Sequence, residues 1–311
     1  MRVLVVTNMY PTEAEPWFGS FVRDQVEDLR ALGLDVEVLS FDGRQSRSEY
    51  AHAARRVRRL AGTGRFDILH AHYGLSGAVA LAQRSVPVVT TFHGSDTGGV
   101  AWQRLVSAAV VRGVVPIFVN RAGPRLLWCR TGHVIPAGVD TNLFVPADRG
   151  MLWRELGWNE AGRYVLFPGG RRNRVKRPDL FAAVVEALRA AGEPAEAVYL
   201  ENLSRSQAAA TVAAADVTLV TSNWEGSPVT VRESLACETP VVSVPVGDVA
   251  ETLEGLPGCE IAPRDVPALS AAVRRALAAD RSGALRERAL VTSREQTARR
   301  VAGVYEEVLA R

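Results

Sequence analysis

One predicted strand-to-helix turn holds residue types well suited to binding a phosphorylated ligand. It lies in the segment TSNWEGSPVTVRESLACETPVVSVPVGDVAE, residues 221–251, which follows a short apolar run. Ser227 is a favourable N-cap residue, and Pro228 fits the first position of a helix. The backbone amides of Val229 and Thr230 would then be donors without helical partners at the positive end of the helix. Such an end is a binding site for a phosphate.

Two glutamates flank this turn. Glu225 lies just before the expected cap and Glu233 lies in the second turn of the helix. A bound diphosphate would repel a carboxylate, so we expect the two side chains to accept hydrogen bonds from sugar hydroxyls instead, one from a ribose and one from a second sugar. In the alternative interpretation Glu225 is a loop charge and Glu233 interacts only with the helix dipole. The local pattern leaves both interpretations open.

A basic loop forms the second cluster. In YVLFPGGRRNRVKRPDLF, residues 164–181, an apolar run ends in glycines, and five of the seven residues from Arg171 to Arg177 are basic. Arginine and lysine at the carboxyl end of a strand can neutralise a diphosphate, including one that departs during group transfer. A solvated basic loop and a nucleic-acid patch are the alternatives. The lack of interleaved aromatic residues disfavours nucleic acid.

Weaker signals come from the first half of the chain. In VVTTFHGSD an apolar run delivers His93 and Gly94 to its carboxyl end, where a histidine can contact a bound sugar. Asp96 has no second carboxylate at metal-binding spacing, so we predict no metal site. In TNMYPTEAEPWFGSF, Gly19 precedes a helix and would let the backbone approach a ligand. The sequence lacks G-x-G-x-x-G after the first strand, which disfavours a dinucleotide fold.

The elements that position these residues alternate between short apolar strands and Ala/Leu/Arg-rich helices. Continuously apolar runs are typical of parallel strands covered on both faces, so we predict a doubly wound α/β fold. The pattern restarts after about residue 145, and PAGVDTNLFVPADRG is the predicted connection. This organisation predicts two Rossmann-like halves that face each other across a cleft. The predicted strands are Val3–Thr7, Val36–Phe41, Ile68–His70, Val86–Phe92, Ile117–Asn120, His133–Pro136, Tyr164–Phe167, Ala197–Leu200, Val217–Thr221 and Val241–Val244, and the predicted helices are Phe21–Leu32, Pro178–Ala190, Ser206–Ala215, Pro228–Cys237 and Ser293–Ala310.

Composition is that of an ordinary globular protein. The 311 residues are 47% hydrophobic and 23% charged, with a net charge of +3, which excludes a disordered chain and leaves enzyme, binding protein and scaffold open. The three scattered cysteines, Cys129, Cys237 and Cys259, predict free thiols in a reducing compartment. The N-terminal apolar run is too short for a signal peptide, and no run is long enough to span a membrane. We therefore expect a cytoplasmic protein.

Together these segments resemble family 4 of the retaining glycosyltransferases, which have the GT-B fold. EGSPVTVRESLACETPVV resembles the E-x(7)-E signature of that family, and VIPAGVDTNLF resembles its linker, with Ala137 in place of asparagine. HAHYGLSG and TTFHGSD are similar to two segments of its first domain. Gly170, Arg171 and Lys176 keep the spacing of its G-R-x-x-x-x-K element. SREQTARRVAGVYEEVLA resembles the terminal helix that crosses back to the first domain.

The resemblance implies a role for each candidate residue. Arg171 and Lys176 would bind the donor diphosphate, Glu233 the ribose hydroxyls, and Glu225 the 3-hydroxyl of the transferred sugar. The Gly226–Val229 turn, which contains Ser227 and Pro228, would bind sugar and phosphate through its amides. Gly170 would lie beside the phosphates, and His93 would lie near the sugar 6-hydroxyl. Gly19 would lie near the phosphates and the acceptor.

The implied reaction moves a hexose-type sugar from a UDP- or GDP-linked donor to an acceptor hydroxyl with retention of configuration. The departing phosphate would help to deprotonate the acceptor, so no dedicated base, metal or cofactor is expected. The acceptor would be a small molecule, a glycan or a lipid-linked sugar. The implied domains are an acceptor-binding domain at 1–145, a nucleotide-sugar domain at 146–292, and a helix at 293–311 that returns to the first domain.

Departures from the family pattern leave base selectivity, acceptor-site shape and sugar-end contacts open. The chain is short, residues 98–130 are abbreviated, and PVGDVAE replaces the commoner G-G-x-x-E. The basic run RRVRRL, with Arg55 to Arg59, is either a solvated helix face or a contact with the inner face of a membrane. A GT-B-shaped nucleotide-sugar epimerase and a non-catalytic two-lobed sugar or nucleotide binder are the competing functions. Binding to nucleic acid is not expected.

Overall fold

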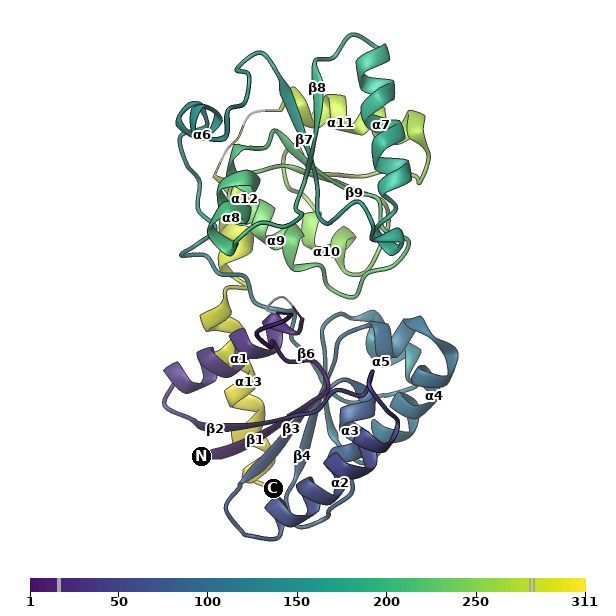
Figure 1. Ribbon diagram of the computed structural model, residues 1–311, viewed down its shortest axis with the longest axis vertical. Coiled ribbons are helices and arrows are strands. Elements are labelled where there is room, and N and C mark those ends of the chain that lie inside the picture. The colour runs from purple at the N-terminus through teal and green to yellow at the C-terminus, as the bar shows by residue number, and fades with distance from the viewer. Residues whose placement is uncertain (16–17, 280, 282) are drawn as a thin grey trace. The chain divides into compact units, whose positions relative to one another are not determined.

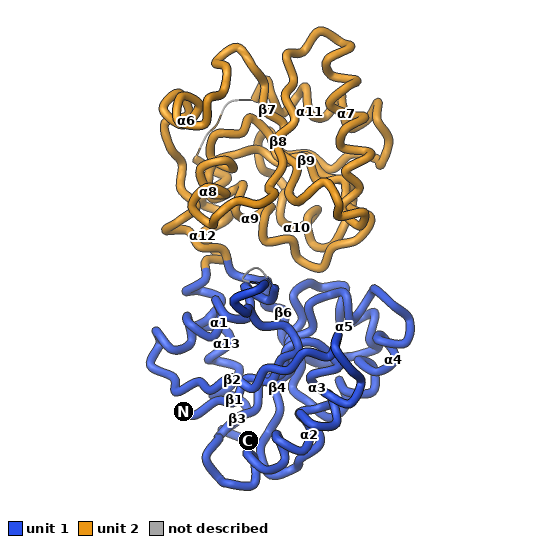
Figure 2. The backbone as a smooth tube through the Cα atoms, in the orientation of Figure 1, with its two compact units in different colours: residues 1–138, 294–311 blue, residues 139–293 orange. Residues whose placement is uncertain are grey.

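The protein divides into two compact units, each built on its own parallel sheet (Figure 2). The computed structural model describes residues 1–15, 18–279, 281 and 283–311; Pro16 and Trp17 of the predicted loop before Gly19 lie outside the described residues. Unit 1 comprises Met1–Gly138 and Arg294–Arg311, and unit 2 comprises Val139–Ser293. The first boundary falls inside the predicted connection. Residues 139–145 belong to unit 2 rather than to the first domain, because Phe144 packs in the unit 2 core.

Unit 1 contains a six-stranded sheet with every pairing parallel and the strand order β2-β1-β3-β4-β5-β6 (Figure 1). This order, with the crossover at β1 and β3, is that of a Rossmann-like doubly wound sheet. Its strands are β1 (Arg2–Thr7), β2 (Asp35–Ser40), β3 (Ile68–His72), β4 (Val88–Phe92), β5 (Val115–Phe118) and β6 (His133–Val134).

Helices cover both faces of this sheet because successive side chains of a strand point to opposite sides. In β1, Val3 and Val5 pack with α1 (Ser20–Ala31) and α13 (Arg294–Leu309), while Leu4 and Val6 pack with α2 (Ser48–Ala61) and α3 (Gly74–Ala80). The helix α4 (Ala101–Val110) packs on Phe92 and Phe118 beside α3. The short π-helix η1 (Ser95–Gly99) precedes α4, and α5 (Ala122–Leu126) follows β5.

Unit 2 contains a five-stranded parallel sheet in the order β11-β10-β9-β7-β8. One hydrophobic cluster lies under α7 and α11, and the other lies under α8, α9 and α12. The strands are β7 (Arg163–Phe167), β8 (Ala195–Tyr199), β9 (Val217–Val220), β10 (Val241–Ser243) and β11 (Glu260–Ile261), and the helices are α6 (Arg149–Leu156), the 3-10 helix η2 (Arg174–Lys176), α7 (Pro178–Ala190), α8 (Arg205–Ala214), α9 (Val229–Ala236), α10 (Val249–Leu253), α11 (Val266–Leu277) and α12 (Ala284–Leu290).

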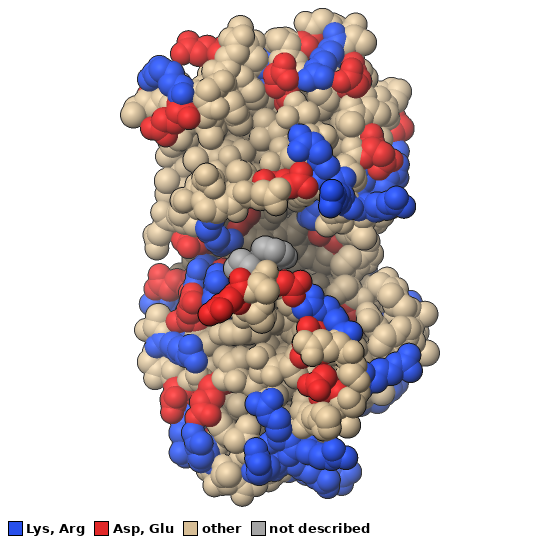
Figure 3. Space-filling view, in the orientation of Figure 1, with Lys and Arg blue, Asp and Glu red and all other residues tan. Residues whose placement is uncertain are grey.

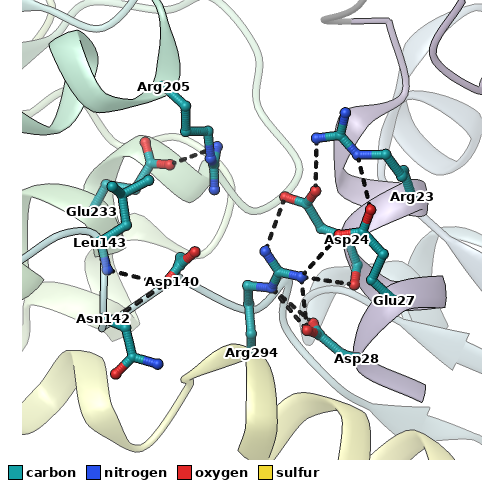
Figure 4. A network of polar contacts seen from close by, with 10 residues as sticks. All are labelled: Arg23, Asp24, Glu27, Asp28, Asp140, Asn142, Leu143, Arg205, Glu233 and Arg294. Atoms are coloured by element: carbon teal, nitrogen blue, oxygen red, sulfur yellow. Dashed lines mark hydrogen bonds and ion pairs between the residues drawn. The ribbon is translucent and has the colours of Figure 1, made fainter. Parts of the chain in front are cut away.

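The terminal helix α13 belongs to unit 1, although unit 2 separates the two in the chain. Its first residue, Arg294, forms ion pairs with Asp24 and Asp28 of α1, at 3.7 Å and 2.7 Å (Figure 4). Near its other end the buried Tyr305 hydroxyl lies 2.5 Å from His70 Nδ1 of β3. Buried apolar and polar contacts therefore fix α13 on the sheet along most of its length.

The predicted fold class is confirmed: both units are α/β with parallel strands flanked by helices. Each predicted strand is present to within a few residues, and α7 has the predicted bounds. The sequence interpretation missed β11, because a two-residue strand carries no periodicity. No helix in the described part of the chain is long and apolar enough to cross a membrane.

Candidate functional site

The turn into α9 differs from the prediction in its cap. Pro228, with an extended ψ of 113°, is the N-cap residue, and the helix begins at Val229, so Ser227 is not the cap. The Ser227 hydroxyl instead donates to Asp248 Oδ2 at 2.8 Å. Local propensity favours a serine cap, but a partner from another loop holds this side chain. The first amides of α9 still have no carbonyl ahead of them within the helix, which preserves an anion-binding end.

Lys176 and Glu225 meet at this turn although they belong to the two separate loops of the sequence analysis. Lys176 Nζ lies 3.0 Å from Glu225 Oε1, and only 21% and 16% of the two side chains are exposed. The Ser222 hydroxyl donates to the same oxygen at 2.8 Å. The structure therefore brings the predicted cation and the predicted hydroxyl-binding carboxylate into one polar cluster.

Backbone contacts fix the two loops against each other. The Asn223 amide donates to the Val175 carbonyl at 2.8 Å, and the Thr221 hydroxyl donates to the carbonyls of Lys176 and Arg177. A Cβ on Gly169 would lie 2.7 Å from Lys176 Cδ. That glycine therefore gives Lys176 its path to Glu225, and the geometry of the pair depends on both loops.

Arg171 lies apart from this pair. Its guanidinium stacks 3.9 Å from the Tyr199 ring centroid and forms an ion pair with Glu201 at 3.2 Å, while most of the side chain is exposed. A Cβ on Gly170 would lie 2.9 Å from Glu201 Oε1, so Gly170 has a packing reason to be glycine. Arg171 also lines an open hollow of about 600 Å³ whose other walls are Arg174, Arg177, Pro178, Asp179 and Tyr199.

Glu233 is buried on α9, with 7% of the residue exposed. Arg205 of α8 forms an ion pair with its Oε1 at 3.4 Å (Figure 4). The guanidinium of Arg205 also lies over the ring of Phe144. The carboxylate is thus held by a cation that the sequence analysis did not single out. Removing a buried carboxylate from water is costly without such a partner.

A buried network behind the turn was also missed. Arg232 Nη2 contacts Asp248 Oδ2 at 2.5 Å, and this is the oxygen that accepts from Ser227. Arg232 and Asp248 are only 3% and 6% exposed. Gly247 has a φ of 56°, and a Cβ there would lie 2.7 Å from the carbonyl oxygen of Gly226. The PVGDVAE loop therefore supports the Gly226–Val229 turn from behind. The signal was present in the sequence, as a charged residue beside Glu233 in a helix that is otherwise buried.

In unit 1 the predicted residue His93 follows β4 and lies in a cluster of aromatic rings. His93 Nε2 is 3.0 Å from His72 Nδ1, and the His93 ring packs against Tyr73 and Phe21 at centroid distances of 4.7 Å and 4.8 Å. Burial lowers the pKa of His72 to about 3 and holds the pKa of His93 well below its ordinary value. His93 is therefore neutral at pH 7, and so is suited to hydrogen bonding.

Two further residues of unit 1 have structural partners. Asp96 is buried and accepts hydrogen bonds from the amides of Gly74 and Gly94; burial raises its pKa to about 6. Gly19 is the N-cap of α1 with a φ of 73°, and a Cβ there would lie 2.4 Å from the backbone of Met9. Among the described residues no group of three or more His, Cys, Asp or Glu side chains is placed to hold a metal ion.

Comparison with known families gives two matches along the chain. The model "Glycosyltransferase Family 4" matches residues 2–143, and the model "Glycosyl transferases group 1" matches residues 162–279. The second range contains the pair Lys176–Glu225 and the whole of α9. The two ranges together take in nearly all of both sheets.

Two curated relatives are glycosyltransferases by name. TuaC of Bacillus subtilis, provisionally named for teichuronic acid biosynthesis, is 23% identical over 88% of this chain and 89% of its own. D-inositol 3-phosphate glycosyltransferase of Mycobacterium marinum is 27% identical over 87% of this chain and 68% of its own.

Solved structures show the same fold. Sucrose-phosphate synthase from Thermosynechococcus elongatus has a TM-score of 0.81 at 19% identity and covers 99% of both chains. HepE from Anabaena, solved in complex with UDP-glucose, has a TM-score of 0.71 at 16% identity, with coverage of 99% of this chain and 100% of that one. Two parallel-sheet units, the motif spacing and these matches lead to one conclusion: the chain belongs to the family 4, group 1 glycosyltransferases and has the GT-B fold.

Proposed function

We propose that this glycosyltransferase is a retaining, metal-independent enzyme that moves a hexose-type sugar from a UDP- or GDP-linked donor to an acceptor hydroxyl. The observation that carries the proposal is the largely buried pair Lys176–Glu225, whose glutamate precedes the amino end of α9. It combines a fixed cation, a hydroxyl-accepting carboxylate and free helical amides, which are the groups that a sugar diphosphate requires. The UDP-glucose complex of a protein with the same fold supports this donor class.

The pair can serve a donor without coming apart. A lysine ammonium has three N–H donors, so Lys176 can hold Glu225 with one and a diphosphate oxygen with another. Both hydrogen bonds described for the Glu225 carboxylate end on Oε1, so Oε2 would accept from the 3-hydroxyl of the sugar. Lys176 then stabilises the charge that develops on the leaving diphosphate.

The other donor contacts follow from the same placement. Glu233, oriented by Arg205, would accept from the ribose hydroxyls, and the amides of the Gly226–Val229 turn would bind sugar and phosphate. Arg171 would turn from Glu201 towards the diphosphate, since its ion pair is largely exposed and therefore weak. The roles of His93 and Gly19 remain predictions from the family pattern. No residue is assigned as a base, because the departing phosphate would accept the proton of the acceptor.

The competing functions need different groups. An epimerase needs acid and base side chains on both sides of a sugar carbon, whereas the Lys176–Glu225–Ser222 cluster suits charge stabilisation. A non-catalytic binder has no use for stabilisation of a leaving group.

A thermal-shift panel of UDP-, GDP- and ADP-linked sugars identifies the donor, because a ligand that binds the native state raises its apparent stability. We expect one donor to raise the melting temperature of the wild type and to lose this effect in Lys176→Ala. NMR of the product anomer then tests retention: a product of inverted configuration would refute that part of the proposal. Failure of all nucleotide sugars to bind would refute the donor class.

A further inference from the structure

The solvent-facing side of α4 is apolar. Val100, Trp102 and Leu105 are 55%, 54% and 63% exposed, and Ala101 and Ala109 are exposed beside them. The side of α4 that faces the core carries Ser107, Ala108 and Val110. A surface helix ordinarily presents polar residues to water, so this helix has apolar residues on both sides. Contiguous exposed apolar surface of this kind marks an interaction site.

Trp128 extends this surface. It lies in the turn after α5, is 65% exposed, and Arg104 of α4 places its guanidinium 5.7 Å from a ring of Trp128. Its φ of 50° is in the left-handed region, which bulky residues rarely adopt. The turn therefore holds a large aromatic side chain in water at a conformational cost, which is a feature of functional surfaces. We call Val100, Trp102, Leu105 and Trp128 the α4–α5 patch.

The segment that carries the patch has charged residues of one sign only. Residues 97–139 contain no aspartate or glutamate but five arginines, of which Arg112, Arg121, Arg125 and Arg130 are exposed. The exposed arginines of α2 lie in the same unit, and α3 packs against both α2 and α4. Figure 3 shows basic side chains gathered over the part of unit 1 where α2 lies, and further basic side chains beside α4.

We propose that the α4–α5 patch docks unit 1 onto an anionic lipid bilayer. Tryptophan and aliphatic side chains enter the interfacial region of a bilayer, where Trp is favoured, and the surrounding arginines bind lipid phosphates. A symmetric contact with a second copy would bring this acid-free surface against itself, and like charges would oppose it. An anionic bilayer satisfies the apolar and the basic parts of the surface together.

This inference changes the role expected of α2. From the sequence, Arg55–Arg59 were expected to form either a solvated helix face or a membrane contact, but α2 buries its apolar residues Ala53, Val57 and Ala61 in the core. Its arginines can attract an anionic surface over a distance, and the α4–α5 patch supplies the side chains that insert. The α4–α5 patch contains no residue of the proposed donor site. Membrane docking goes beyond the proposed glycosyl transfer, and each of the two can be refuted without the other.

The test is co-sedimentation of the full chain with vesicles of phosphatidylglycerol and, separately, of phosphatidylcholine. The variant Trp102→Ser/Trp128→Ser removes exposed rings and should fold as the wild type does. The matched control, Met151→Ser/Val291→Ser, removes side chains of unit 2 that are 53% and 69% exposed. A third variant, Arg55→Gln/Arg56→Gln/Arg58→Gln/Arg59→Gln, neutralises α2. Donor-dependent thermal shifts measured on each variant report on the proposed function separately.

We expect the wild type and the unit 2 control to bind phosphatidylglycerol vesicles, and the double tryptophan variant to bind at least about tenfold more weakly, since affinity scales with inserted apolar area. Wild-type protein that fails to bind anionic vesicles would overturn the proposal. So would binding that only the α2 variant loses. Concentration-dependent dimerisation that the Trp102→Ser/Trp128→Ser variant abolishes would show that a second copy covers the patch instead.

Discussion

Lys176 and Glu225 neutralise each other's charge at the turn into α9, and this pairing sets what a substitution there should do. In Lys176→Ala the leaving diphosphate loses its fixed cation, while Glu225 keeps the hydrogen bond from Ser222. We expect turnover to fall by about two to three orders of magnitude, the range for loss of one preorganised charge-stabilising group, with the fold retained.

Steady-state rates beside a circular dichroism spectrum check this prediction. Arg174→Ala is the matched control, since Arg174 is an exposed cation on the same 3-10 helix and should leave turnover within a fewfold of the wild type. Wild-type turnover in Lys176→Ala would remove the diphosphate assignment. Equal losses in both variants would point to net charge rather than to the Glu225 pair.

Arg232 and Asp248 make a prediction that separates stability from binding. Arg232→Met leaves Asp248 buried without its cation, and we expect the free energy of unfolding to fall by about 3 kcal/mol. Ser227→Ala removes only the hydroxyl that ties the turn to Asp248, so it should raise the donor KM severalfold with little loss of stability. Denaturant titration and donor kinetics measure the two effects. An unchanged donor KM in Ser227→Ala would show that the network does not position the turn.

At the scale of elements, the backbone geometry at the start of α1 requires a glycine at position 19, whether or not that residue contacts a ligand. An alanine there must adopt a φ of 73° and place its Cβ 2.4 Å from the backbone of Met9. Gly33→Ala is the control, because Gly33 has a φ of 86° but no atom within 4 Å of the added carbon. The conformational penalty is about 1 kcal/mol in both variants, and the clash adds about 1–3 kcal/mol in Gly19→Ala alone. Similar melting temperatures for the two variants would contradict this account.

The ends of β3 and β4 predict acid sensitivity. Burial lowers the pKa of His70, His72 and His93, and that of His72 to about 3. Between about pH 6.5 and pH 3 the unfolded chain therefore binds protons that the native state does not, and stability is lost as the pH falls. Asp96, with its pKa raised to about 6, has the opposite effect. Between about pH 6 and the ordinary pKa of an aspartate, its protonation stabilises the native state as the pH falls.

Each proton bound only by the unfolded chain changes the unfolding free energy by about 1.4 kcal/mol per pH unit. We expect His72→Asn to make the dependence of the denaturation midpoint on pH shallower below pH 6.5. The exposed His52, replaced by Gln, should leave the slope as it is in the wild type. If His72→Asn and wild type have the same slope, His72 is protonated in the native state.

The sequence predicted elements better than it predicted contacts between loops. The strands were recognisable because both of their faces are buried, which produces apolar runs without alternation. The cap of α9 was predicted one residue early because Ser227 has a tertiary partner, Asp248, that local propensity ignores. The ion pair of Arg232 was missed for the same reason: a charged residue in a sequence reads as exposed unless its partner is known.

The pair Lys176–Glu225 was predicted in part. Glu225 and the basic loop that contains Lys176 were identified from the local sequence, and their roles were implied by the family pattern, but their direct contact was not predicted. It depends on the β7 and β9 pairing, which puts the loops after these strands side by side. The contact between His72 and His93 has a similar origin, because His72 ends β3 and His93 directly follows the adjacent strand β4.

For the molecule as a whole, the family assignment rests on two separate matches, one in each unit. The proposed chemistry uses arginine, lysine and backbone amides to stabilise charge, which leaves no role for a divalent ion. We expect activity to be retained in excess EDTA and to be unchanged by added magnesium or manganese. A strict requirement for either ion would contradict the proposed mechanism.

The most direct test of the central claim is the release of free nucleoside diphosphate from the donor identified by thermal shift, measured with and without an acceptor. We predict release that depends on the acceptor in the wild type, is conserved in Arg174→Ala, and falls by about two to three orders of magnitude in Lys176→Ala. Release at the same rate in Lys176→Ala, or conversion of the donor sugar to an epimer without release, would contradict the account.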